Sequence, residues 1–192
     1  MPQTQPRIGQ WARDAFVRVL QGMLPVLRSA QPAVGGAGPG TEAPDFTLRD
    51  HLGVPITLSH HRGRPTVILW TRAGQPWSSP GGLEREPLLA LMQSTRLQVG
   101  WLVVCAHYTR SNPPTPSLPY PVLLDPTGRV GQLYGGTHRP RVCLVSPEGR
   151  VVHREFEGPL DPGAEARLSW MSDLLDEMLM HSARQQSQGE QG

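Results

Sequence analysis

Hydrophobic residues form short runs along the middle of the chain, separated by residues that favour turns. A β-branched and aromatic run at residues 66–70 precedes a loop rich in glycine, proline and serine, and leucines follow at helical spacing over residues 83–96. This order is typical of a buried strand, a loop and a helix. Further apolar runs predict strands at residues 97–107 and 121–125, and a short helix at 129–134 that ends at a glycine pair.

Alternating patterns predict two hairpins. One consists of the runs that end at Asp50 and begin at Ile56, which are joined by a turn containing glycine. The other pairs residues 141–145 with residues 151–156. A leucine- and methionine-rich stripe over residues 161–184 predicts an amphipathic C-terminal helix.

The pattern divides the chain into four segments. Residues 1–30 are predicted to form an amphipathic helix, residues 31–39 a flexible linker, residues 40–184 one α/β domain, and residues 185–192 a disordered polar tail. Three interpretations of the first helix stay open. It packs on the domain, it pairs with a partner or a second copy of the chain, or it lies on a membrane surface through its arginines.

Composition excludes several classes of protein. The 192 residues carry a net charge of +2, and their basic residues are scattered arginines, so we expect no nucleic-acid partner. The two cysteines lie far apart and form no metal-ligand spacing, so we expect neither a disulfide framework, nor a metal, nor a cofactor. Asp14 and Arg18 interrupt any secretory apolar region, so we expect a cytoplasmic protein.

Several short motifs occur in a fixed order along residues 40–160. They are Ala43-Pro44-Asp45-Phe46, Arg62-Gly63-Arg64-Pro65, Leu124-Asp125-x-x-Gly128, Tyr134-Gly135 and Pro140-x-x-Cys143-Leu144-Val145-x-x-Glu148-Gly149. With the element order, they resemble the redoxin branch of the thioredoxin-like fold, which comprises AhpC/TSA-type peroxiredoxins and TlpA-like thioredoxins. The resemblance implies a three-layer α/β fold with a mixed central sheet, an N-terminal hairpin and added terminal helices. It also implies thiol oxidoreductase or antioxidant activity.

The resemblance places the reactive cysteines in the loop that follows the run at residues 66–70. There Ser78 and Gly81 occupy the positions of the two cysteines, and Gln75 occupies that of the peroxide-binding threonine. Pro140 corresponds to the family's cis-proline, whose loop would face this segment. A serine hydroxyl provides neither a thiolate nor a disulfide, so the usual thiol mechanism is not available at Ser78.

We therefore predict a redox-inactive domain that binds a protein or peptide. The predicted binding residues are Gln75, Trp77, Ser78, His138, Arg139 and Pro140. Two enzymatic alternatives remain. Cys105 or Cys143 would act as an unorthodox redox cysteine, or Ser78 would act as a nucleophile with His138 as its base. Both cysteines lie in apolar runs that the thioredoxin-like strand order separates by a central strand, so we expect them to be buried and unpaired.

Overall fold

The computed structural model describes residues 35–72, 85–106, 120–136, 140–156 and 164–189. All of them belong to the unit Gly35–Gly192, one of two units into which the chain divides. Their centre is one seven-stranded sheet with the strand order β2-β1-β5-β4-β3-β6-β7. The predicted mixed sheet is therefore confirmed.

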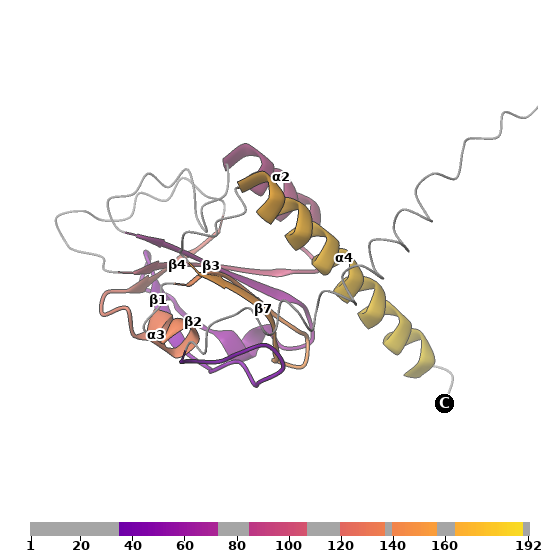
Figure 1. Cartoon of the computed structure of the whole chain (residues 1–192), viewed down its shortest axis with the longest axis horizontal. Coiled ribbons are helices and arrows are strands. Elements are labelled where there is room, and N and C mark those ends of the chain that lie inside the picture. The colour runs from indigo at the N-terminus through magenta and orange to yellow at the C-terminus, as the bar shows by residue number, and fades with distance from the viewer. Residues whose placement is uncertain (1–34, 73–84, 107–119, 137–139, 157–163, 190–192) are drawn as a thin grey trace, which may run out of the picture. The chain divides into compact units, whose positions relative to one another are not determined.

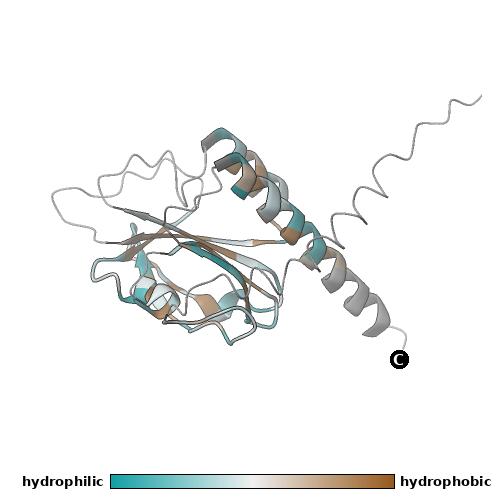
Figure 2. Ribbon diagram, viewed as in Figure 1, coloured by the Kyte–Doolittle hydropathy of each residue, from teal (hydrophilic) through white to brown (hydrophobic). Residues whose placement is uncertain are grey.

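The three inner parallel strands are rich in β-branched and aromatic residues. They are β3 (Thr66–Arg72), β4 (Gly100–Ala106) and β5 (Val122–Asp125). The antiparallel strands are β1 (Thr47–Asp50), β2 (Pro55–Thr57), β6 (Pro140–Val145) and β7 (Val151–Phe156). Both predicted hairpins, β1–β2 and β6–β7, are confirmed. Apolar residues make up the middle of the inner strands (Figure 2), as expected when both faces of a sheet are covered.

Helices cover both faces of the sheet, which gives three layers (Figure 1). On one face lie α2 (Arg85–Thr95) and α4 (Ala164–Gly189), whose buried side chains share a core with strand residues such as Val103 and Cys105. On the other face lie α3 (Arg129–Gly135) and the 3-10 turn Leu58–His61, with a core that includes Trp70 and Cys143.

Two boundaries differ from the prediction. The strand predicted from residue 97 begins only at Gly100, because the carbonyl of Thr95 accepts bonds from the backbone N–H groups of Gln98 and Val99 and forms a turn. In that turn Leu97 is 83% exposed. The last helix extends to Gly189, into the segment predicted as a disordered tail. The glutamines of this segment favour helix without continuing the apolar stripe.

Residues 35–46 form a strap that crosses α3 and the edge strand β7. Ala37 donates a backbone hydrogen bond to Leu133 O (3.0 Å), and Gly40 donates one to Val151 O (2.7 Å). The buried Arg154 guanidinium donates to the carbonyl oxygens of Ala37 (2.7 Å) and Tyr134 (2.8 Å). Residues 35–39, part of the predicted linker, thus lie against the sheet domain.

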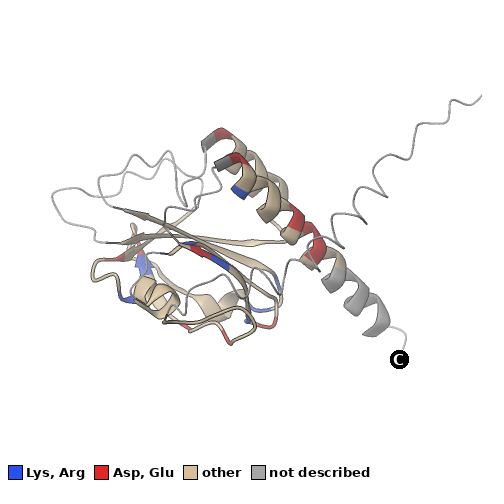
Figure 3. Cartoon of the chain, in the orientation of Figure 1, with Lys and Arg blue, Asp and Glu red and all other residues tan. Residues whose placement is uncertain are grey.

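A buried ion pair joins α4 to β7. Arg167 on α4 donates from Nε and Nη2 to the two carboxylate oxygens of Glu155, at 2.8 and 2.7 Å. Figure 3 shows both signs of charge within β7, among mostly uncharged strands. In the described part of the chain, no helix is long and apolar enough to span a membrane.

Candidate functional site

Two strands define the end of the sheet where the sequence places its site. Strand β3 ends at Arg72 and α2 begins at Arg85, so the predicted loop lies between them in the chain. Strand β6 starts at Pro140 and runs antiparallel to β3, with Val142 opposite Leu69. Pro140 is therefore level with the C-terminal end of β3. Open α/β sheets commonly bind ligands beyond this end of their parallel strands.

Most of the predicted site residues lie outside the described part of the chain. They are Gln75, Trp77, Ser78, Gly81, His138 and Arg139. Their roles stay predictions, and so does the pairing of Ser78 with His138 as nucleophile and base. The peptide bond before Pro140 involves Arg139, so its predicted cis form also falls outside these residues.

Pro140 is buried against α3, where two glycines allow close approach. A Cβ atom added at Gly135 would lie 2.9 Å from Pro140 Cδ and 3.4 Å from the ring of Phe156. At Gly131, one turn earlier, an added Cβ would lie 3.9 Å from the Pro140 ring, which is an ordinary contact. The glycine at residue 135 therefore lets α3 pack directly on Pro140.

Three aromatic rings pack together on the face of the sheet that α3 covers. The ring centroid of Tyr134 lies 5.5 Å from that of Trp70 and 6.2 Å from that of Phe46. The Tyr134 hydroxyl donates to Pro44 O at 2.8 Å, and burial raises its pKa. Trp70 is buried, and its Nε1–H has no hydrogen-bond acceptor among the described residues.

Asp125 fixes α3 in this position. Its carboxylate accepts backbone hydrogen bonds from Arg129 (3.0 Å), Val130 (2.9 Å) and Gly131 (3.3 Å), which are the first N–H groups of the helix. A carboxylate at a helix N-terminus satisfies these groups and interacts favourably with the helix dipole. Asp125 is thus a structural residue, although it lies at the C-terminal end of β5.

The chain has two cysteines, Cys105 and Cys143, and neither side chain is accessible for thiol chemistry. Both side chains are 0% exposed, and they belong to cores on opposite faces of the sheet. Strand β3 separates their strands, so their Cα atoms lie roughly 10 Å apart or more, beyond disulfide reach. Burial raises the pKa of Cys105 to about 11 and that of Cys143 to about 12. The prediction that both are buried and unpaired is confirmed.

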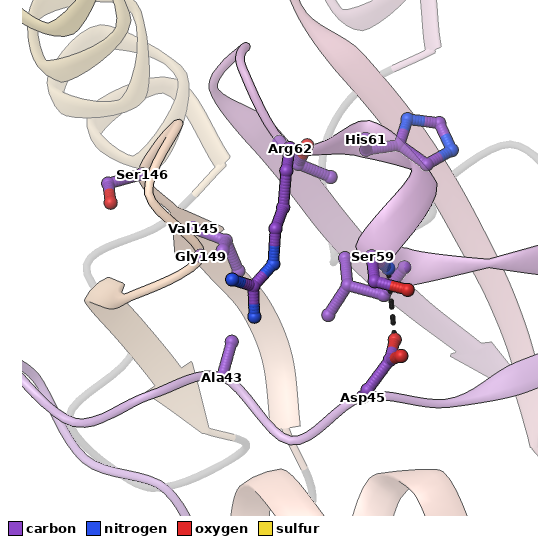
Figure 4. Close-up of a pocket in the computed structure, with 10 residues that line it drawn as sticks. Ala43, Asp45, Ser59, His61, Arg62, Val145, Ser146 and Gly149 are labelled. Carbon is purple, nitrogen blue, oxygen red and sulfur yellow. Dashed lines mark hydrogen bonds between the residues drawn. The ribbon is translucent and has the colours of Figure 1, made fainter.

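A small hollow lies at the opposite end of the sheet, between the strap, the Leu58–His61 turn and the β6–β7 turn (Figure 4). Its volume is about 20 Å³, which accommodates about one water molecule. Asp45 at its rim accepts the backbone N–H of Ser59 at 2.9 Å, and Arg62 pairs with Glu42 at 2.8 Å. Ligand pockets are much larger, so this hollow is structural.

The chain matches no family model, and it matches no curated protein significantly. Solved structures do match. A putative protein disulfide isomerase from Bacteroides thetaiotaomicron is 17% identical with a TM-score of 0.61, over 81% of this chain and 99% of that one. A hypothetical protein from Sinorhizobium meliloti 1021 is 18% identical with a TM-score of 0.60, over 77% of this chain and 87% of that one.

A third match is a thiol:disulfide interchange protein of the thioredoxin family from Chlorobium tepidum TLS. It is 14% identical with a TM-score of 0.53, over 76% of this chain and 99% of that one. The chain has a thioredoxin-like fold. At these identities the matches establish the architecture of the domain, and a shared fold does not by itself imply a shared activity.

The features around Pro140 were not predicted from the sequence. The sequence places Trp70 only in a buried run, and it places Gly135 at the end of a helix and in the Tyr134-Gly135 motif, without indicating what either residue contacts. The spacing of Gly131 and Gly135, four residues apart on a short helix, was the one available signal, because it places both on one helix face. What packs on that face depends on β6, which is distant in sequence.

Proposed function

We propose that this thioredoxin-like domain binds an extended peptide segment of a partner protein and does not exchange thiols. The observation that carries the proposal is the placement of Cys105 and Cys143, whose fully buried side chains lie on opposite faces of the sheet. A thiol with a pKa of about 11 is ionised in roughly one molecule in 10,000 at pH 7, so neither group is a competent nucleophile.

Main-chain pairing supports a peptide as the ligand. An extended segment forms backbone hydrogen bonds with exposed main chain and needs no reactive side chain on the protein. Pro140 and the end of β3 supply a rigid base, because the proline ring is fixed between α3 and β7. Trp77, in the predicted loop, is the proposed anchor for an apolar side chain of the ligand.

Peptide selection followed by mapping tests this proposal. Disulfide-free 12-residue peptides would be selected from a random library on the full chain, and amide shifts would locate the bound peptide. We expect binding to perturb residues around Pro140 and Trp70, with unchanged affinity in the Cys105→Ala/Cys143→Ala double variant. Binding that requires a cysteine, or that maps to the hollow near Asp45, would contradict the proposal.

A further inference from the structure

The turn between β1 and β2 carries two exposed apolar side chains at its tip. Leu52 is 76% exposed and Val54 is 49% exposed. A Cβ atom added at Gly53, between them, would meet no atom of the described residues within 4 Å, so the tip protrudes. Polar residues usually occupy such turns. A lone exposed leucine is ordinary, whereas two apolar side chains on one protruding turn form a small apolar surface.

The backbone N–H groups of this tip are bonded within the protein. Those of Leu52 and Val54 donate to Asp50 Oδ1 at 2.9 and 2.8 Å, and that of Gly53 donates to Asp50 O at 3.0 Å. Val54 O accepts the Asp50 N–H at 2.9 Å, and Gly53 O accepts Arg49 Nη1 at 2.7 Å. A hydrocarbon phase offers no hydrogen-bond partners, so backbone groups can enter it only if they are satisfied internally. The tip meets this requirement for all three of its N–H groups.

The exposed charges around the tip are positive. Arg49 is exposed on β1, and Arg96 is exposed directly after α2. The Tyr120 hydroxyl donates to Met92 O at 2.7 Å, which brings the second half of α2 beside the start of β5, the strand that pairs with β1. The acidic residues of β1 and β5 are both buried, and β2 and the second half of α2 have none. Arginines beside an apolar tip are attracted to anionic lipid headgroups.

We propose that the β1–β2 turn inserts Leu52 and Val54 into the surface of an anionic membrane, with Arg49 and Arg96 at the headgroups. This attachment does not depend on the proposed peptide binding. The turn lies toward the N-terminal end of β5, because Asp50 pairs with Leu123 next to the start of that strand. The lipid contact and the proposed peptide site are therefore at different ends of the sheet. Two apolar side chains and two arginines give weak, reversible binding.

Co-sedimentation of the full chain with lipid vesicles tests the proposal. The probes are sucrose-loaded vesicles of phosphatidylcholine and phosphatidylglycerol in equal amounts, compared with vesicles of phosphatidylcholine alone. We expect the natural chain to bind the anionic vesicles more tightly, and Leu52→Ser/Val54→Thr to bind them about tenfold more weakly. Arg49→Gln keeps a donor for Gly53 O and removes the charge, so we expect a loss of about fivefold. The thermal midpoints should stay unchanged in all variants, because the substituted side chains are exposed.

Met180→Ser is the matched control, because Met180 is 55% exposed on α4 and follows the exposed acids Asp176 and Glu177. These acids oppose an anionic surface, so we expect this variant to bind like the natural chain. Every variant keeps residues 1–34, so any lipid contact of that segment is common to all of them. Vesicle binding that Leu52→Ser/Val54→Thr leaves unchanged would overturn the proposal. Equal binding to both kinds of vesicle, or no binding to either, would also overturn it.

Discussion

The ion pair between β7 and α4 allows a quantitative test of how the last helix is held. The Arg167 side chain is 1% exposed and that of Glu155 is 14% exposed, with 2.7 Å between Nη2 and Oε1. Removing one partner of a buried pair costs about 3–5 kcal/mol, because the other charge loses its counter-ion without regaining water. Glu155→Leu removes both carboxylate contacts from the more deeply buried charge, so we expect a loss of about 3–4 kcal/mol. Arg167→Met should cost about 2 kcal/mol, because the Glu155 carboxylate retains some access to water.

A double-mutant cycle separates the pair from its surroundings. We expect the Glu155→Leu/Arg167→Met variant to be less destabilised than Glu155→Leu alone, because apolar replacement of a buried pair is often close to neutral. The free energy of unfolding would be measured by urea denaturation, followed by circular dichroism at pH 7. A loss below about 1 kcal/mol for Glu155→Leu, or simple additivity in the double variant, would refute the reasoning.

Three further predictions concern pH, packing and thiol access. Burial lowers the pKa of His153, so the unfolded protein binds a proton at this residue more readily than the folded protein does. The free energy of unfolding should therefore decline as pH falls below about 6.5, and it should decline less in His153→Phe. Burial also lowers the pKa of His61, so some pH dependence should remain in both proteins. Gly135→Ala should lower the free energy of unfolding by about 1–3 kcal/mol in urea melts, because its Cβ would lie 2.9 Å from the neighbouring proline ring; an unchanged midpoint would contradict the contact. Cys105 and Cys143 should resist iodoacetamide in the native protein at pH 8 and react in denaturant, and labelling at the rate of a free thiol would show that one of them is accessible.

The strands and helices were predictable because their signals are local. The run of apolar residues in β3 is by itself typical of a buried strand. The glycine pair at the end of α3 is by itself typical of a helix end. The burial of Arg167 was not predictable, because it depends on Glu155 from another element. The contact of Gly135 with Pro140 likewise depends on the packing of a helix on a distant strand. Local patterns therefore predicted the strands and helices around the candidate site, while the contacts among these elements come from tertiary structure.

The most direct test of the proposed absence of thiol exchange is an assay of disulfide reduction by the purified full chain. Insulin reduction by dithiothreitol would be followed with and without the protein, with Cys105→Ala and Cys143→Ala variants in parallel. Buried thiols with raised pKa values predict no acceleration above the protein-free rate in any of the three proteins. Acceleration by the natural chain that either substitution abolishes would contradict the account and identify a catalytic cysteine.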